Sequence, residues 1–180
     1  MLENKNTNLK IEGISELSFS PMQLIDLNLV LELESASHIH PWSEKNFSDS
    51  LLAGHWAYCI RPMAGKLVKD FHTNLPILWG YCILFPAVDE LHLLNITVSP
   101  KFRRLGIASR IMQVIEGVAF RQKFPKIILE VRPSNVSAVK LYESAGYDVI
   151  GVRKNYYPLN PGSNLREDAH VMAKTIMLDE

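Results

Sequence analysis

Residues 91–115 read LHLLNITVSPKFRRLGIASRIMQVI, and the character of the sequence changes halfway along this stretch. The first part is apolar and rich in β-branched residues and ends at a Ser-Pro pair, which predicts a strand over Glu90–Val98. Beyond it, apolar residues recur at Ile107, Ile111 and Ile115 with the spacing of one helix face. The stretch therefore predicts a strand that feeds a helix through a glycine-containing turn.

The turn itself combines a glycine and positive charge with a helix N-terminus. Unpaired backbone N–H groups and the helix dipole favour a phosphate at such a position. Gly106 permits close approach to the backbone, and the basic residues between Lys101 and Arg104 add positive charge beside it. A diphosphate would fit this turn. The alternative is an ordinary tight turn with solvated basic side chains.

Downstream of the helix, strand and helix patterns continue. The run KIILEV predicts a short strand over Lys126–Val131, and Asn135 can cap a second helix that Gly146 ends. Two further strands are expected at Tyr147–Val152 and His170–Ile176, with a loop over Asn155–Asp168 between them.

Upstream of residue 91, helices precede strands. Ser20 followed by Pro21 predicts the start of a helix that ends near Ser37, and Ser43 can cap a short helix that runs to Leu52. An antiparallel meander is expected from strands at His55–Ile60, Ile77–Phe85 and Glu90–Val98. The segment 61–76 is long for a hairpin connection, so it is either a flexible excursion or a functional segment.

Bulk composition limits the class of protein. With 180 residues, 47% of them apolar, the chain fits one compact domain over residues 14–180, preceded by a flexible extension over residues 1–13. Nineteen basic and nineteen acidic side chains balance, so no direct binding to nucleic acid is expected. No apolar run approaches the roughly 20 residues that span a bilayer, and the polar first residues lead us to expect no secretory signal. The expected location is therefore the cytoplasm, without membrane contact.

The cysteines and the clustered histidines do not point to a metal. Cys59 and Cys82 lie far apart in apolar runs, which favours buried, reduced thiols over a zinc site or a disulfide. His38 and His40 lack neighbouring ligands at suitable spacing, so they are expected to be ordinary loop histidines.

The turn and its surroundings resemble a known family. RRLGIA is similar to the R/Q-x-x-G-x-G/A signature of the GNAT superfamily of N-acetyltransferases, with Ala108 where many members have glycine. The resemblance extends over roughly Ile14–Ile176 and includes LHLLNITVSP, EVRPSNVSAVKLYESAGY, HPWSEKNF, RKNYYP and REDAHVMA. It implies an α/β fold (α+β in some schemes), with a mixed, mostly antiparallel central sheet split around the cofactor and helices on both faces.

The resemblance also implies acetyl-CoA as the cosubstrate and no metal. The strand end at Thr97 would line the pantetheine arm, and a backbone N–H near Val98 would polarise the thioester carbonyl. Asn135 would contact the cofactor arm, although an asparagine before a helix is also a simple N-cap. The cofactor-binding residues implied are Ile96, Thr97, Val98, Arg103, Arg104, Leu105, Gly106, Ile107, Ala108, Ser109, Asn135 and Tyr142.

Two residues take the catalytic roles that the resemblance implies. Glu130 occupies the general-base position, where a carboxylate removes amine protons directly or through a water. Tyr142 occupies the general-acid position, where a phenol protonates the departing CoA thiolate. The alternatives are a strand-edge carboxylate that faces solvent and a core aromatic with a satisfied hydroxyl.

The acceptor is expected to be a protein N-terminus. Loops with Pro41, Trp42, Tyr156 and Tyr157 would flank its groove, although packing at the edge of the core explains them equally well. The acidic residues of the segment Arg166–Asp168 would hold an α-ammonium or a basic side chain, or they are solvated loop charges.

Within the family, the local details resemble the branch that acetylates N-terminal alanine of a small-subunit ribosomal protein by direct transfer, without an acyl-enzyme. The rivals are an acetyltransferase for lysine side chains or small amines, and a noncatalytic acetyl-CoA-binding module.

Overall fold

The structure is a computed structural model that describes residues 17–62, 77–158 and 165–178. The predicted extension over residues 1–13 and most of the segment 61–76 lie outside these residues.

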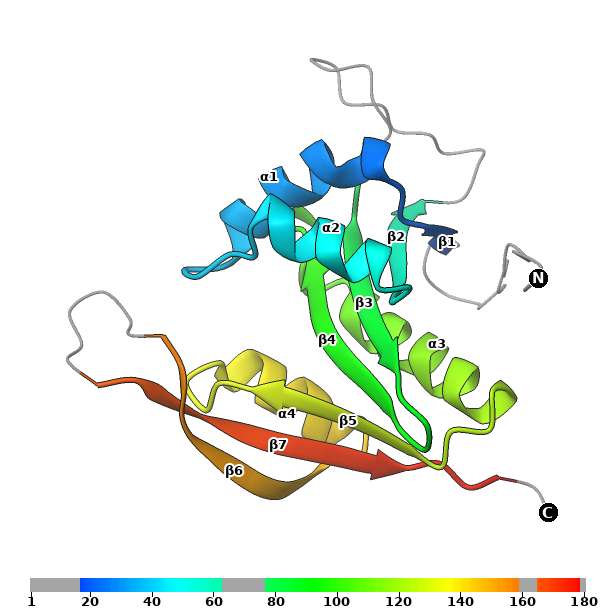
Figure 1. The fold of residues 1–180 in the computed structure, drawn as a ribbon, viewed down its shortest axis with the longest axis vertical. Helices are drawn as coiled ribbons and strands as arrows, with labels where there is room; N and C mark the ends of the chain where they lie inside the picture. The colour runs from blue at the N-terminus through cyan, green and yellow to red at the C-terminus, as the bar shows by residue number, and fades with distance from the viewer. Residues whose placement is uncertain (1–16, 63–76, 159–164, 179–180) are drawn as a thin grey trace. The chain divides into compact units, whose positions relative to one another are not determined.

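The described chain contains one mixed sheet and four α-helices, with short 3₁₀ turns before α1 and α3 (Figure 1). The elements are β1 (Leu17–Pro21), α1 (Leu27–Ser37), α2 (Glu44–Leu52), β2 (Trp56–Pro62), β3 (Gly80–Pro86), β4 (Leu91–Val98), α3 (Ile107–Arg121), β5 (Lys126–Val131), α4 (Val136–Ser144), β6 (Asp148–Tyr157) and β7 (Glu167–Thr175). The seven strands follow the order β1-β2-β3-β4-β5-β7-β6. β4 and β5 pair in parallel, whereas β1–β2, β5–β7 and β6–β7 are antiparallel, which confirms the predicted mixed sheet.

The pairing between β4 and β5 is short. Its register covers only three pairs, from Leu91 opposite Ile127 to Leu93 opposite Leu129, although both strands continue beyond these residues. The end of β4 therefore carries amides that β5 does not pair.

The described chain forms two compact units. The first comprises the residues up to Ile83 together with Asn95–Ile107, and the second comprises Leu84–Leu94 together with the residues from Ala108 onward. In the first unit, α1 and α2 lie side by side over β2 and β3 (Figure 1). Its core is a cluster of Met22, Leu27, Val30, Leu33, Phe47, Ala57, Cys59, Leu78, Tyr81 and Ile83.

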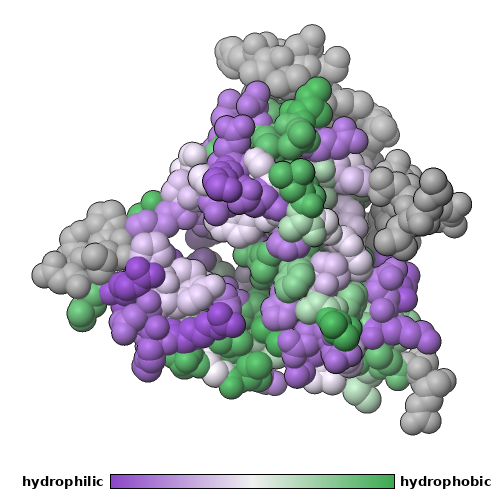
Figure 2. All heavy atoms as spheres, viewed as in Figure 1, coloured by the Kyte–Doolittle hydropathy of each residue, from purple (hydrophilic) through white to green (hydrophobic). Residues whose placement is uncertain are grey.

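The second unit has its own buried residues on α3, β5, α4 and β7, and at Tyr147 between α4 and β6. They include Ile111, Met112, Ile115, Ala119, Ile127, Leu129, Val131, Tyr142, Tyr147, Ala169 and Met172. Exposed apolar side chains also occur on β6, such as Ile150 and Val152. Hydrophobic and hydrophilic residues are interspersed on the face shown in Figure 2. Among the described helices, none is long and apolar enough to cross a membrane.

Three residues begin or end helices as predicted. The Ser43 hydroxyl accepts a hydrogen bond from the amide of Asn46 (3.3 Å) at the start of α2, and the Asn135 side chain accepts one from the amide of Ala138 (3.3 Å) at the start of α4. Gly146 ends α4 with φ 83°. The helical face that begins at Ile107 and the strand KIILEV are also confirmed.

The predicted helix start at Ser20 was wrong. Ser20 and Pro21 end strand β1, where they pair with Cys59 and Tyr58, and α1 begins only at Leu27. A proline is compatible with the end of an edge strand because no neighbouring strand needs its missing N–H.

The predicted loop Asn155–Asp168 is shorter than expected. β6 continues to Tyr157 and β7 begins at Glu167, with a register shift between Arg153 and Tyr157. Asn155 takes a left-handed conformation (φ 52°) within this irregularity. The polar residues that suggested a loop therefore form a bulged continuation of the strand.

Gly80 lets the first residues of β3 approach β4. A Cβ atom at this position would lie 2.5 Å from the carbonyl oxygen of Thr97.

We expect Gly80→Ala to lower the melting temperature by about 3–10 °C, because one of the two backbones must move. Thermal unfolding followed by circular dichroism measures this. Gly151→Ala is the control, because a Cβ atom there meets nothing within 4 Å. Equal melting temperatures for Gly80→Ala and wild type would contradict the close approach.

Cys59 and Cys82 are buried free thiols, as predicted. Burial raises the pKa of each to about 12, so only about 10⁻⁴ of either thiol is ionised at pH 8. We expect both to react with a thiol reagent orders of magnitude more slowly in the native protein than in denaturant. Absorbance titration of released thiolate compares the two states, and rapid native labelling of either cysteine would contradict the burial.

Candidate active site

The residues that precede the turn before α3 contact Trp79, which lies just before β3. Trp79 and Phe102 stack with ring centroids 5.0 Å apart, and the amide of Ser99 donates to the carbonyl of Trp79 (2.9 Å). Arg104 and Gly106 both have left-handed backbones, with φ 63° and 74°. Left-handed backbone conformations are also found in the turns that form anion-binding nests. A helix N-terminus also offers unpaired N–H groups, so this backbone has the chemistry that favours a phosphate group.

Thr97 lies near the end of β4 and is 3% exposed. Its neighbours Ile96 and Val98 are half-buried, and the carbonyl of Val98 accepts a hydrogen bond from Nε of Arg103 (3.3 Å). The first unit thus holds the strand end and the basic turn residues that the sequence analysis assigned to the cofactor.

A buried carboxyl group stands behind this strand end. Glu34 is 1% exposed and comes from α1. It accepts hydrogen bonds from the amide of Trp42 (2.9 Å), from the hydroxyl of Tyr81 and, at 3.4 Å, from the side chain of Asn95. The Thr97 hydroxyl oxygen also lies 3.4 Å from Oε2 of Glu34. The carboxyl group therefore ties α1 to the loop before α2, to β3 and to β4.

His38 joins this cluster from the loop after α1. Its Nε2 lies 2.7 Å from Oγ1 of Thr97 and 3.3 Å from Oε2 of Glu34. Its side chain is 35% exposed. The imidazole is therefore held in a defined position and is still accessible to solvent.

Trp42 and Pro41 lie in a loop, as predicted. The Trp42 ring packs against the core and lies 5.4 Å from the ring of Phe47, so packing at the core edge describes its contacts. Pro41 is exposed.

Glu130 is partly buried and forms an ion pair. Its side chain is 26% exposed, and its Oε1 lies 3.0 Å from Nε of Arg153. The Tyr156 hydroxyl is a second neighbour: burial and its hydrogen bond to Glu130 raise the pKa of Tyr156. The carboxylate is therefore paired within the second unit.

Tyr142 is 5% exposed on α4. Burial raises its pKa, so the phenol stays protonated throughout the working pH range. Its ring lies 6.1 Å from that of Tyr147.

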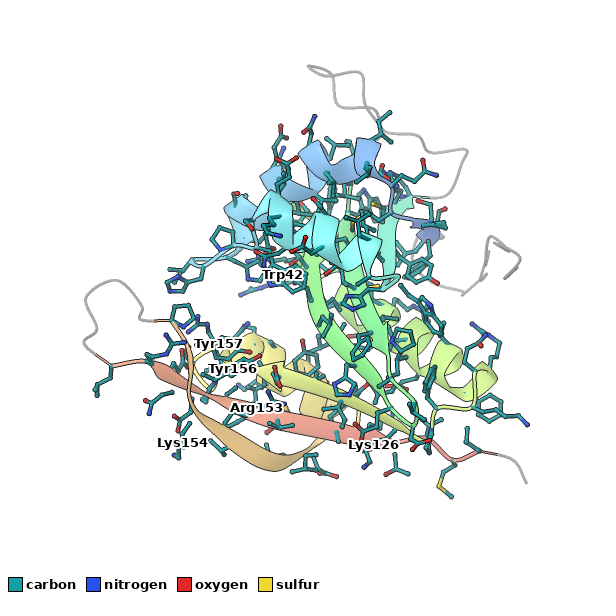
Figure 3. All side chains as sticks on the ribbon, in the orientation of Figure 1. Trp42, Lys126, Arg153, Lys154, Tyr156 and Tyr157 are labelled. Carbon is teal, nitrogen blue, oxygen red and sulfur yellow. The ribbon has the colours of Figure 1, made fainter. Side chains whose placement is uncertain are left out.

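Tyr156 and Tyr157 lie on β6 rather than in a loop, with their rings 5.0 Å apart (Figure 3). The guanidinium of Arg132 lies over the Tyr157 ring at 4.2 Å and within 3.1 Å of Oε2 of Glu167. Glu167 also accepts a hydrogen bond from the amide of Ser134 (2.8 Å). These contacts connect the loop before α4 with the start of β7.

The acids proposed to hold an ammonium group already have partners. Asp168 pairs with Lys154 (2.7 Å) and accepts from the amide of Asn155 (2.8 Å). Arg166 donates to the carbonyls of Asn155 and Tyr156. The segment therefore fastens β6 to β7, and its charges are not simply solvated.

The Glu167 contacts predict a pH-dependent stability. Although burial opposes the charged form, hydrogen bonds from Ser134 and Arg132 hold the pKa of Glu167 below its usual value. Because the folded pKa is depressed, the stabilisation is present above the unfolded value of about 4.3 and is lost as pH falls through the folded value. We expect Glu167→Gln to lower the melting temperature by about 2–4 °C at pH 7. The difference from wild type should shrink below about pH 4 in thermal unfolding curves.

The control for this experiment is Glu143→Gln, a change at an exposed position of α4. A Glu167→Gln difference that persists unchanged at low pH would contradict the role of the ionised carboxylate.

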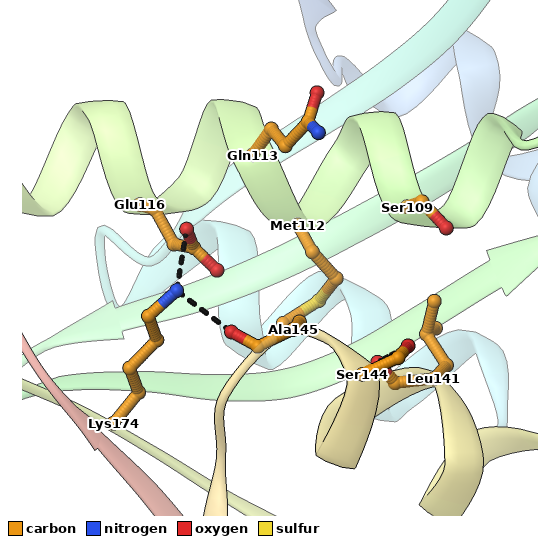
Figure 4. A pocket seen from close by; sticks show the side chains of 8 residues that line it. All are labelled: Ser109, Met112, Gln113, Glu116, Leu141, Ser144, Ala145 and Lys174. Carbon is orange, nitrogen blue, oxygen red and sulfur yellow. Dashed lines mark hydrogen bonds and ion pairs between the residues drawn. The ribbon is translucent and has the colours of Figure 1, made fainter.

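A pocket of about 280 Å³ lies between α3, α4 and β7 in the second unit (Figure 4). Lys174 is one of the lining residues, and its Nζ lies 2.8 Å from Oε2 of Glu116 and 2.7 Å from the carbonyl oxygen of Ala145. Ser109 is the predicted cofactor-binding residue that it contains. Its lining is Ser109, Met112, Gln113, Glu116, Leu141, Ser144, Ala145 and Lys174.

Sequence reasoning missed the Glu34–His38 pair and the partner of Glu130. Glu34 and His38 stand four residues apart at a helix end, a spacing that places side chains together and was a usable signal. Arg153 gave no comparable signal because its contact with Glu130 depends on the β5-β7-β6 order. Within residues 17–62, 77–158 and 165–178, no group of three or more His, Cys, Asp and Glu residues is arranged to hold a metal ion.

Comparison with known proteins places these features in a family. The acetyltransferase (GNAT) family description matches residues 27–147. A [ribosomal protein bS18]-alanine N-acetyltransferase of Haemophilus ducreyi is 32% identical over 82% of this chain and 92% of its own length, and that of Escherichia coli K12 is 30% identical over 89% and 99%. The crystal structure of the ribosomal-protein-S18-alanine N-acetyltransferase from Escherichia coli superposes with a TM-score of 0.75, at 29% identity, over 91% of this chain and 96% of that one. The chain therefore belongs to the acetyltransferase (GNAT) family and is an N-acetyltransferase.

Proposed function

We propose that this enzyme transfers the acetyl group of acetyl-CoA to the α-amine of N-terminal alanine on a small-subunit ribosomal protein, the homologue of bS18, in the cytoplasm. The observation that carries the proposal is the match to relatives that are named for this reaction, which spans 82% of the chain at 32% identity. We further propose that residues 14–180 form a single catalytic domain.

Acetyl-CoA is proposed to bind along the end of β4 and the turn before α3. The backbone of Ile96, Thr97 and Val98 would hold the pantetheine arm, and the N–H near Val98 would polarise the thioester carbonyl. The left-handed backbones of Arg104 and Gly106 support the assignment of the segment Arg103–Ser109 to the diphosphate. Asn135 and Tyr142 complete the proposed set.

Glu130 is proposed as a general base and Tyr142 as the general acid. The pairing of Glu130 with Arg153 supports its ionised form, which is the form that accepts a proton. The protonated Tyr142 phenol can supply the proton that the departing thiolate takes up. No cysteine takes part, because both described thiols are buried and their pKa values are raised to about 12.

The acceptor is proposed to contact Pro41, Trp42, Tyr156 and Tyr157. In the first unit, the hydrogen bond from the Trp42 amide to Glu34 supports a fixed loop. In the second unit, the Arg132 guanidinium over the Tyr157 ring supports a fixed aromatic pair. Rigid aromatic side chains contribute contact area at a small entropic cost.

Mass spectrometry of acetyl transfer to a peptide panel tests the acceptor. The panel has free N-terminal Ala, Ser, Met or Gly, and N-blocked peptides that carry lysine. We expect modification only of free N-termini, most rapidly with alanine. Modification of blocked lysine peptides would move the enzyme to another branch of the family, and transfer to small amines alone would exclude a protein N-terminus as the substrate.

A further inference from the structure

The buried Glu34 and the partly exposed His38 form a pair to which the proposed mechanism assigns no role. A carboxyl group that is 1% exposed is costly unless its oxygens are satisfied, and here the loop after α1, β3 and β4 all contribute donors. The cluster touches Thr97, in the strand proposed to hold the thioester, and the amide of Trp42, in the loop proposed to contact the acceptor. We propose that His38 is a catalytic base for the acceptor amine and that Glu34, Tyr81 and Thr97 fix its tautomer. This inference rests on the proposed function.

The contacts of Nε2 decide which ring nitrogen carries the proton. A carboxylate oxygen only accepts hydrogen bonds, and Oε2 of Glu34 lies 3.3 Å from Nε2. Oγ1 of Thr97, at 2.7 Å, can accept from Nε2 while its own hydrogen points to the hydroxyl oxygen of Tyr81 at 3.1 Å. Nε2 is therefore the protonated nitrogen, and a neutral imidazole then has its lone pair on Nδ1.

Tyr81 completes a directional chain of hydrogen bonds. Burial and the neighbouring charge of Glu34 raise the pKa of Tyr81, so the phenol keeps its hydrogen and donates it to Oε2 of Glu34. Each donor in the series His38, Thr97, Tyr81 thus points toward the buried carboxylate. A carboxylate that orients the imidazole of a base through hydrogen bonds is a known way to hold one tautomer.

Nδ1 has the access that a base requires. The His38 side chain is 35% exposed, and its contacts with Thr97 and Glu34 are both made by Nε2. Thr97 adjoins Val98, whose amide is proposed to polarise the thioester. An imidazole fastened to Thr97 therefore sits beside the proposed reacting carbonyl, within the same unit of the protein.

The proton balance leaves room for this base. An α-ammonium group must lose one proton before its lone pair attacks, and it loses a second as the C–N bond forms and the C–S bond breaks. His38 accepts the first proton at Nδ1 and passes it to water. The electron pair of the C–S bond leaves with sulfur, the thiolate takes up one proton, and the products are an N-acetyl peptide, CoA thiol and one released proton.

The test compares His38→Ala with His92→Ala. His92 is the matched control because its Nε2 also lies near a glutamate (Glu90, 3.2 Å) and its side chain is 30% exposed. With the alanine peptide as acceptor, we expect His38→Ala to lower kcat by about 100-fold or more and His92→Ala to change it less than threefold. Acetyl-CoA affinity, measured by calorimetry, should stay within twofold of wild type for both.

Chemical rescue separates a base from a structural side chain. Added imidazole should restore part of the kcat of His38→Ala in a concentration-dependent way and should leave wild type unchanged. The isosteric Glu34→Gln, whose amide no longer requires Nε2 to donate, should lower kcat by about tenfold with acetyl-CoA affinity retained. Thermal unfolding shows that each variant is folded at the assay temperature.

A His38→Ala enzyme within threefold of wild type would overturn the role of His38 and leave the proposed function standing. A loss of activity that imidazole does not restore would also overturn it. A wild-type enzyme that binds acetyl-CoA but acetylates no free N-terminus would overturn the proposed function and, with it, the role of His38.

Discussion

Gly106→Val is expected to weaken acetyl-CoA binding by at least 100-fold. Gly106 has φ 74°, a region that a β-branched residue avoids, and its backbone faces the place proposed for the diphosphate. The substitution both disfavours the required backbone and places a branched side chain at the start of α3. Calorimetric titration with acetyl-CoA measures the affinity directly.

Gly54→Val is the matched control for backbone strain. Gly54 has nearly the same conformation (φ 77°), and a Cβ atom there would meet nothing within 4 Å. The two variants should therefore lose similar stability, whereas only Gly106→Val should lose affinity for acetyl-CoA. Normal binding by a folded Gly106→Val protein would show that this turn does not hold the phosphates.

Glu130→Gln is expected to lower kcat by about 10²- to 10⁴-fold, because an amide cannot accept the amine proton. Acetyl-CoA affinity should stay within twofold of wild type, since the carboxylate handles protons and not the cosubstrate. The freed Arg153 is 56% exposed and can be solvated, so the fold should tolerate the change. Steady-state kinetics with the alanine peptide, combined with calorimetry, separates the two effects.

Glu90→Gln serves as the control for Glu130→Gln. Its side chain is 33% exposed and pairs with Lys126 at 3.4 Å, so the substitution also removes a half-exposed ion pair. It should leave kcat nearly unchanged. Equal losses of turnover and of acetyl-CoA binding in Glu130→Gln would contradict its assignment as a base.

The local pattern around the turn could be predicted from the sequence because its signals are short-range. Ser43 and Asn135 cap their helices through neighbouring amides, and Gly106 and Gly146 take the left-handed conformations that favour glycine. The period change after Val98 likewise depends only on the residues near it. The mixed sheet followed from the family resemblance.

Features that depend on distant pairing could not be predicted in the same way. Strand β1 forms because Leu17–Pro21 pairs with β2, which lies more than thirty residues further along the chain. The local propensity of Ser20 and Pro21 does not reveal this pairing. The continuation of β6 through Tyr156 and Tyr157 likewise depends on its partner β7.

The same limit applies to the site. Glu130 and Tyr142 were found through the resemblance, whereas the partners of Glu130 and of Glu34 come from other strands and loops. His38 was assigned to an ordinary loop, because its contact with Thr97 brings together residues 59 positions apart.

The central claim is direct acetyl transfer from acetyl-CoA to a free protein N-terminus. It is tested most directly by mass spectrometry of a quenched reaction that contains the enzyme, isotopically labelled acetyl-CoA, an alanine-initiated peptide with an internal lysine, and the same peptide with a blocked N-terminus. The account predicts one labelled acetyl group on the α-amine of the free peptide, none on the blocked peptide, and none on the enzyme. A label on the lysine of the blocked peptide, or on a residue of the enzyme that later passes to the peptide, would contradict it.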